Sequence, residues 1–200
     1  LEPDLIICMG EDDEWFPARK LQRFAPVVPT TYQAYWKDDL KQVAGWLQRT
    51  SDLDAGMVAY DKLISDGVAH YGDLIASKKV VYLQYLPDTT NFALNTTGML
   101  QAQILTDLGG TLFGGLLGNS DGDFISLERI GEFAEADGFF VQDLSGSGAL
   151  DALAELPLWT SLPAVKAGHV VASRGNVNYG SIYTAQELAR NWTALYATMA

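Results

Sequence analysis

An apolar stripe of helical period, between Asp54 and Ala76, constrains the fold of this chain more than any other feature. Its members are Met57, Tyr60, Leu63, Ile64, Val68, Tyr71, Leu74 and Ile75, which recur at i, i+3, i+4 and i+7 spacing over about six turns. The pattern predicts one helix of about 30 Å, long enough to span a small domain. A core helix of one domain and a helix that joins two lobes would both carry such a stripe, so periodicity leaves both open.

Strand and helix patterns alternate after this segment. Three short apolar runs read as buried strands: Val80–Tyr85 (VVYLQY), Gly138–Gln142 (GFFVQ) and His169–Ser173 (HVVAS). Helices are expected at residues 98–108, from Ser126, up to Glu155 and at residues 182–199, and a polar loop is expected at residues 87–95. Alternation of this kind predicts an α/β fold built on a mainly parallel sheet.

The first fifty residues give a weaker version of the same pattern. Strands are expected at residues 5–9 and 27–28, and helices at residues 18–24 and 36–48. The run Glu11 to Glu14 reads as a solvated acidic loop. The single cysteine, Cys8, lies in the first apolar run, so the chain can form no internal disulfide and we expect a buried thiol.

Charge and composition exclude several classes of function. A net charge of -12 argues against a nucleic-acid partner, because a phosphate backbone would be repelled. No stretch approaches the roughly 20 apolar residues of a membrane span. The two histidines, His70 and His169, have no neighbouring Cys or second His, which argues against a transition-metal site. The single G-x-S-x-G, Gly118 to Gly122, lies in a glycine-rich, loop-like segment and not directly after a predicted strand, so a hydrolytic enzyme of the α/β class is only the alternative to a binding protein.

The best candidate for a binding site follows the last predicted strand. Residues 174–179 are rich in hydrogen-bonding groups, and Ser181 can cap the helix that follows. Open α/β sheets bind ligands at such loops, where strands end and helices begin. Aromatic and polar side chains expected at loop positions near strand ends complete the candidate ligand-binding set, which is Trp15, Tyr85, Phe92, Arg174, Asn176, Asn178 and Tyr179.

Four segments in order also resemble the substrate-binding proteins of ABC-type iron-siderophore importers. They are the strand entry L-E-P-D-L-I-I from Leu1, L-Q-R-F-A-P-V-V from Leu21, I-S-L-E-R-I from Ile125, and P-L-W-T-S-L-P-A-V-K-A-G-H-V-V from Pro157. The resemblance implies a two-lobed class III periplasmic-binding-protein fold. It assigns residues 1–50 to an incomplete N-terminal lobe, 51–77 to an interlobe helix and 78–200 to the C-terminal lobe, with the first ligand loop expected to precede this chain.

The same resemblance supplies the expected partners. It implies a ferric siderophore as ligand, an ABC permease as partner, no cofactor, no catalysis, an extracytoplasmic location and membrane attachment only through a lipid anchor outside this chain. Tyr179 aligns with a ligand-contacting tyrosine of the family, although the aromatic expected two positions earlier is here Val177. Glu128 matches the acid that the family uses to dock on permease arginines, and it is equally an ordinary acid in the first turn of a helix.

The charged residues favour one class of siderophore. A tri-catecholate complex carries several negative charges, and burying them in a cleft requires clustered Arg or Lys. The candidate loops offer only Arg174, and the run Glu11 to Glu14 would add repulsion. We therefore expect a ferric hydroxamate or mixed-type siderophore. Heme and cobalamin are the alternatives, since related proteins bind both and either His70 or Tyr179 could ligate a heme iron.

Overall fold

The structure is a computed structural model that describes residues 2–9, 17–30, 35–85, 91–94, 98–114, 124–143, 148–174, 177 and 180–200. Contacts divide the chain into two compact units, Leu1–Leu53 and Asp54–Ala200. The division falls inside one long helix, so almost all of this helix belongs to the second unit. Its expected role of joining two lobes stays a prediction.

The first unit contains two strands and two helices. Strand β1 (Ile6–Met9) pairs in parallel with β2 (Val27–Thr30), from Ile6 opposite Val27 to Met9 opposite Thr30. Helix α1 (Ala18–Leu21) connects them, and α2 (Trp36–Trp46) follows. Cys8 is buried, as expected for a thiol in an apolar strand. The order of elements predicted for this region is therefore confirmed, although α1 is shorter than expected.

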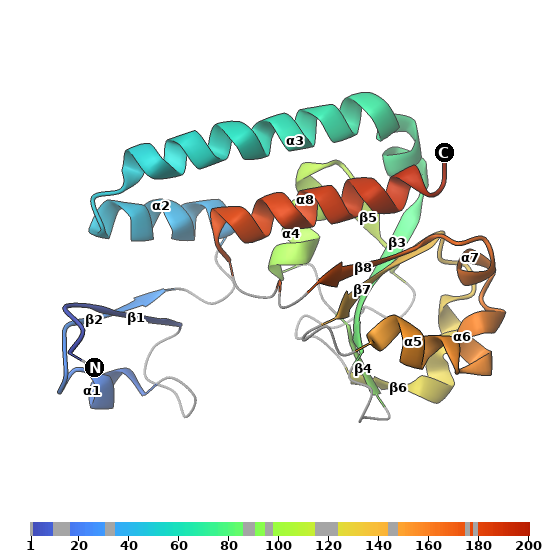
Figure 1. Cartoon of the computed structure of the whole chain (residues 1–200), viewed down its shortest axis with the longest axis horizontal. Helices are drawn as coiled ribbons and strands as arrows, with labels where there is room; N and C mark the ends of the chain where they lie inside the picture. The colour runs from blue at the N-terminus through green and yellow to red at the C-terminus, as the bar shows by residue number, and fades with distance from the viewer. Residues whose placement is uncertain are drawn as a thin grey trace. The chain divides into compact units, whose positions relative to one another are not determined.

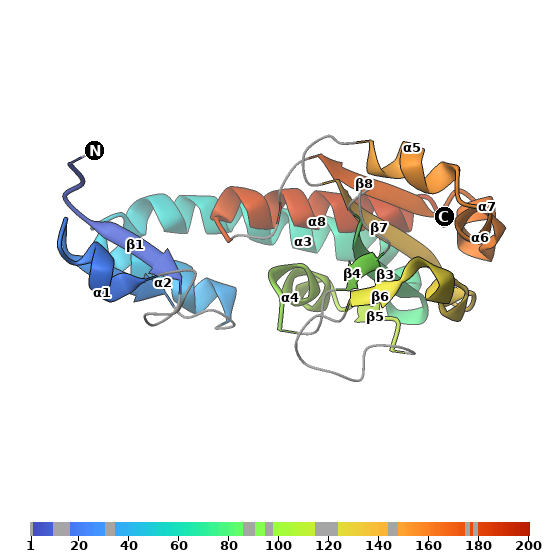
Figure 2. The same ribbon diagram turned by 90° about the horizontal axis from the view of Figure 1, so that it is seen from below.

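Helix α3 (Thr50–Ser77) is continuous, which confirms the prediction from its apolar stripe. It packs on α8 (Ile182–Ala197) at two glycines, where a Cβ would approach the facing helix closely. A Cβ on Gly56 would lie 2.7 Å from Ile182 Cγ1, and one on Gly67 would lie 2.8 Å from Thr193 Oγ1. Figures 1 and 2 show the two helices running side by side through the second unit. Glycine therefore sets the close spacing of this helix pair.

The sheet of the second unit has the order β6-β4-β3-β7-β8, with β5 also paired to β3. Strands β3 (Lys79–Tyr85), β7 (Gly138–Asp143) and β8 (Val170–Arg174) are parallel, and β5 (Thr111–Leu112) is parallel to β3. Strands β4 (Asn91–Leu94) and β6 (Phe124–Ser126) are antiparallel to their neighbours. The sheet is thus mixed. The polar loop expected at residues 87–95 is wrong in part, because β4 lies within it.

Helices cover both faces of this sheet (Figure 1). Helices α4 (Leu100–Asp107) and α8 pack together on one face. The opposite face carries the 3-10 helix η1 (Leu127–Phe133) and helices α5 (Ala149–Ala154), α6 (Pro157–Ser161) and α7 (Pro163–Lys166). Ser181 caps α8 by accepting the Thr184 N–H at 3.1 Å, and Ser126 caps η1, as expected from the sequence. Helix α4 begins two residues later than expected.

Candidate functional site

The carboxyl ends of three parallel strands meet at one edge of the sheet. Strands β3, β7 and β8 end at Tyr85, Asp143 and Arg174. Their registers align Gln84 with Gln142 and Asp143 with Arg174, so the three strands end at the same edge of the sheet. Open α/β sheets bind ligands at this edge, which makes it the candidate site.

The segment after β8 is attached to the start of α4. Val177 is buried, and its carbonyl oxygen accepts a hydrogen bond of 3.0 Å from Nε2 of Gln101, in the first turn of α4. At the other end of the segment, a Cβ on Gly180 would lie 3.9 Å from Leu100 Cδ2. Helix α4 therefore contacts both described residues of this stretch, Val177 and Gly180, and the cap of α8 follows Gly180.

A row of polar side chains lies across the sheet just below this edge. Gln84 on β3, Gln142 on β7 and Ser173 on β8 stand in register. Gln142 and Ser173 are almost fully buried, and the Tyr82 hydroxyl donates to Oε1 of Gln142. Polar side chains are uncommon in a core, so this row is the main departure from an apolar interior.

The protonation of Tyr82 fixes the direction of this hydrogen bond. Burial raises the pKa of the Tyr82 phenol far above its ordinary value, and a hydrogen bond with the Gln101 side chain offsets only part of that rise. Tyr82 therefore keeps its proton and acts as the donor. Oε1 of Gln142 is then the acceptor, and its Nε2 is a buried donor without a hydrogen-bond partner within the described residues.

Two of the predicted ligand-binding residues lie in the core. Tyr85 and Phe92 are paired across β3 and β4, with ring centroids 5.3 Å apart and exposed fractions of 4% and 0%. The expectation that Phe92 stands in a loop is wrong, because pairing with β3 places it in a strand. Tyr85 is the last residue of β3, as predicted, but its ring points into the apolar core. Ligand contact by either residue stays a prediction.

The remaining predicted ligand-binding residues fall outside what the structure describes. Trp15, Asn176, Asn178 and Tyr179 are not among the described residues, and for Arg174 only the backbone of β8 is described. Val177, between two of them, is described and buried. Sequence patterns thus predicted the segment at the strand edge, but they did not identify the polar residues Gln142 and Gln101 beneath it. Gln142 sits in an apolar strand and Gln101 in an amphipathic helix, and neither position stands out from spacing alone.

Glu128, the predicted docking residue, is exposed in the first turn of η1. Its backbone N–H donates to Oγ of Ser126 at 3.4 Å, the weak end of the hydrogen-bond range. Exposure of the Glu128 side chain leaves its carboxylate open to contact by a partner.

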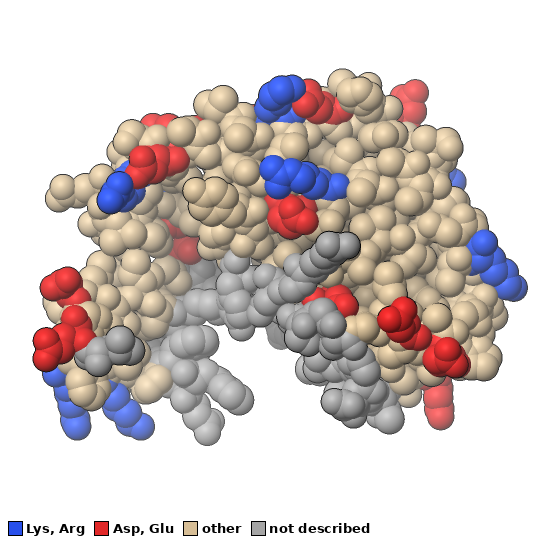
Figure 3. Space-filling model, in the orientation of Figure 1, with Lys and Arg blue, Asp and Glu red and all other residues tan. Residues whose placement is uncertain are grey.

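Helices α3 and α8 lie on the other side of the sheet from η1, and charges of both signs are interspersed over them (Figure 3). Pairs such as Lys62 with Asp66 and Arg190 with Glu187 account for part of this pattern.

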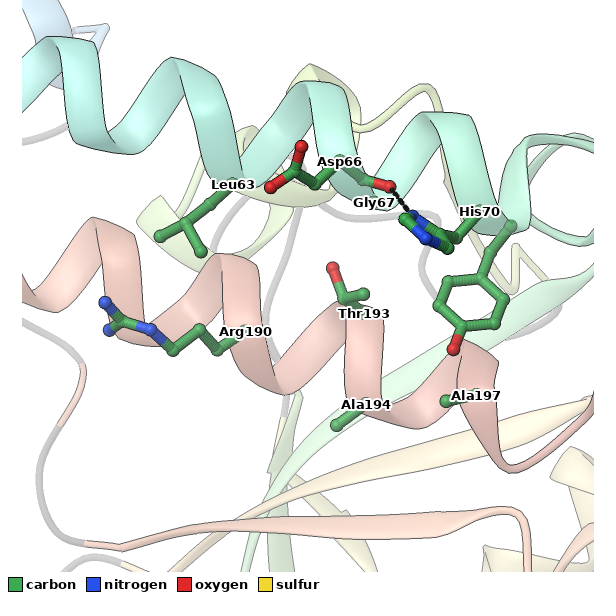
Figure 4. Close-up of a pocket in the computed structure, with 9 residues that line it drawn as sticks. Leu63, Asp66, Gly67, His70, Arg190, Thr193, Ala194 and Ala197 are labelled. Atoms are coloured by element: carbon green, nitrogen blue, oxygen red, sulfur yellow. Dashed lines mark hydrogen bonds between the residues drawn. The ribbon is translucent and has the colours of Figure 1, made fainter.

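A shallow groove of about 420 Å³ lies elsewhere, between α3 and α8. Its lining includes Leu63, Gly67, His70 and Thr193, and Figure 4 shows the two helices contributing opposite walls. Nδ1 of His70 lies 2.7 Å from the backbone oxygen of Asp66. The nearby end of α8 packs over the start of β7, where a Cβ on Gly138 would lie 3.2 Å from Leu195 Cδ1. The groove is therefore at the amino end of the strands, away from the candidate site.

The described parts of the chain contain no group of three or more His, Cys, Asp or Glu side chains that could hold a metal ion. Among the same residues, no helix combines the length and the apolar character required to cross a bilayer.

Comparison with known proteins identifies the class of protein. The family model described as periplasmic binding protein matches residues 1–176, and the chain belongs to that family. The class III fold expected from the sequence is confirmed. No curated protein sequence matches the chain.

Solved structures of siderophore-binding proteins share the fold. The triscatecholate siderophore binding protein FeuA from Bacillus subtilis, complexed with ferri-bacillibactin, has a TM-score of 0.82 at 20% identity, covering 100% of this chain and 73% of that chain. The Fe3+-Desferal-bound siderophore binding protein FhuD from Vibrio cholerae has a TM-score of 0.74 at 21% identity, covering 98% and 76%. The siderophore periplasmic binding protein from the fuscachelin gene cluster of Thermobifida fusca has a TM-score of 0.76 at 20% identity, covering 98% of this chain and 74% of that chain.

Proposed function

We propose that this protein captures a ferric siderophore at the carboxyl edge of β3, β7 and β8 and delivers it to an ABC permease. The observation that carries the proposal is the match of residues 1–176 to the periplasmic binding protein family, together with structural neighbours whose names state siderophore binding. The polar row beneath the strand edge supports the same location. Membership of this family favours an extracytoplasmic location and a binding role without catalysis.

The ligand is proposed to be a ferric hydroxamate or a mixed-type siderophore. The iron of such a complex is already coordinated, so the protein needs aromatic walls and hydrogen-bond donors and no metal ligand of its own. The neighbours bind ligands of more than one kind, including a triscatecholate complex, so the fold does not select between them. The preference rests on charge, because a net charge of -12 disfavours a polyanionic ligand.

Tryptophan quenching can test the proposal on the full-length protein. The protein is titrated separately with a ferric hydroxamate, a ferric tri-catecholate, heme and cobalamin. Tight quenching by the hydroxamate is expected, and Tyr179→Ala should weaken it. Tight binding of the tri-catecholate alone would overturn the ligand class, and tight binding of only heme or cobalamin would replace the siderophore as ligand.

Permease docking is proposed to involve Glu128. Its exposure and its place in the first turn of η1 leave the carboxylate available to an arginine of the partner. Glu128→Lys should abolish siderophore uptake by cells while leaving the affinity of the purified protein intact. Glu132→Lys is the matched control, because it makes the same charge change in η1 at a carboxylate that is already paired within the protein. Oε1 of Glu132 lies 2.7 Å from Nε of Arg129. Normal uptake with Glu128→Lys would refute the docking role.

A further inference from the structure

Gln101 links three elements at the candidate site. Its side chain is fully buried, and Nε2 donates to the Val177 carbonyl oxygen at 3.0 Å. Its own backbone oxygen accepts a hydrogen bond of 3.0 Å from Nε1 of Trp192 on α8. The residue is thus fixed by α8 on one side and holds Val177 on the other.

Packing makes this support rigid. The rings of Tyr82, Phe140 and Trp192 form one cluster under α4 and α8, with centroid distances of 5.1 Å from Tyr82 to Phe140 and 4.9 Å from Phe140 to Trp192. Both pairs are close to perpendicular, the edge-to-face geometry that aromatic rings favour. All three side chains are buried, so Gln101 rests on side chains with little freedom to move.

We propose that Gln101 is a positioning residue for ligand binding, which fixes the backbone of Val177 at the candidate site. The inference rests on the proposed function, because it assigns a role at the same site. In the sequence Val177 lies between Asn176 and Asn178, and Tyr179 follows, so the hydrogen bond fixes the backbone at a position among the predicted ligand-binding residues. A segment held before the ligand arrives loses less conformational entropy on binding.

Gln186 on α8 provides a matched control. Nε2 of Gln186 on α8 donates to the backbone oxygen of Gly56 at 3.0 Å, the same bond type and length that Gln101 makes. Gln186 is also buried, but its bond ties α8 to α3 instead of to the candidate site. Substitution of either residue by Leu removes one such bond, Gln101→Leu also removes the hydrogen bond with Tyr82, and only Gln101→Leu should affect the ligand.

The experiment compares Gln101→Leu and Gln186→Leu in the full-length protein. Affinity for a ferric hydroxamate is measured by titration, and amide hydrogen exchange of the peptide that contains Val177 is measured without ligand. Gln101→Leu should weaken affinity roughly three- to tenfold, the effect of losing the hydrogen bond that holds Val177, and should speed this exchange. Gln186→Leu should leave both unchanged. Equal affinities and equal exchange in the two variants would overturn the inference.

A second variant protects the test against misfolding. In Gln101→Glu the ionised carboxylate cannot donate to the Val177 carbonyl, whereas the protonated acid can. Burial raises the pKa of such a carboxyl. The ligand affinity of the Gln101→Glu variant, relative to wild type, should therefore recover as pH falls from about 8 to about 5. A pH-independent ratio would contradict the positioning role. If wild type binds no ferric siderophore, the proposed function fails, and exchange at Val177 still decides the role of Gln101.

Discussion

The two faces of the strands β3, β7 and β8 differ in chemistry, although the same strands supply both. Alternate residues point to opposite faces. The buried part of the face toward η1, α5, α6 and α7 is apolar, and it includes Val81, Leu83, Tyr85, Phe139 and Val141. The face toward α4 and α8 carries the rings of Tyr82 and Phe140 and ends, toward the carboxyl edge, in the polar row of Gln84, Gln142 and Ser173.

This difference separates stability from function within one sheet. An apolar face contributes burial and close packing, and it requires no hydrogen-bond partners. A buried polar row is costly unless every group is paired, so its presence beneath the candidate site needs a reason. We infer such a reason from Tyr82, which hydrogen-bonds with both Gln142 and Gln101, the residue that holds Val177. We therefore expect substitutions on the apolar face to change stability alone, and substitutions in the polar row to change ligand affinity as well.

The largest expected effect comes from the apolar face, through Phe139→Ala. Phe139 is fully buried and packs against Trp159 and Phe133, at centroid distances of 5.0 Å and 6.4 Å. Removing its ring should lower the free energy of unfolding by about 3–5 kcal/mol, through lost burial and a residual cavity. Urea unfolding measures this loss. Affinity of the folded protein for a ferric hydroxamate should stay unchanged. A large drop in affinity would contradict the claim that the apolar face contributes to stability alone.

Sequence patterns could predict the elements that form locally, but not the elements and contacts that depend on distant parts of the chain. Periodicity located α3, α8 and β7, because each is long or strongly apolar and forms its pattern locally. It missed β4, whose residues Asn91–Leu94 follow a polar stretch and become a strand only by pairing with β3 and β6. At the site, sequence chose residues 174–179 from their place after a strand. The support by Gln101 depends on a contact across 76 positions, which spacing cannot reveal.

A smaller effect is expected from the polar row, through Tyr82→Phe. The substitution removes the hydroxyl that donates to Gln142 and leaves that buried amide oxygen without this donor. An unsatisfied buried polar group costs about 1–3 kcal/mol, so stability should fall by that amount, as measured by urea unfolding. Affinity for the ligand should fall too. Tyr60→Phe is a matched control that should leave affinity unchanged. The Tyr60 hydroxyl donates to Asp107 at 2.5 Å, and Asp107 lies at the end of α4 that is away from Gln101. Unchanged affinity in Tyr82→Phe would remove the polar row from the site.

The smallest effect is expected at the amino end of the same strands, where Asp137 joins β3 to β7. Burial alone would raise the pKa of the Asp137 carboxyl, but hydrogen bonds from the Lys79 backbone N–H at 2.8 Å and from Lys78 Nζ at 2.9 Å outweigh it and hold the pKa below its usual value. A carboxyl with a lowered folded-state pKa stabilises the protein above its unfolded pKa, near 3.9 for Asp, and this contribution is lost as pH falls through the folded pKa.

Asp137→Asn should therefore cost less than about 1 kcal/mol near neutral pH, because the pair with Lys78 is partly exposed, and this cost should shrink on acidification. Urea unfolding of both proteins between about pH 6 and about pH 2 measures the difference. Ligand affinity should be the same in both, since the pair lies at the end of the strands opposite the candidate site. A cost that is constant with pH would show that the carboxylate charge is not what stabilises this end, and a change in affinity would show that the two ends of the strands are coupled.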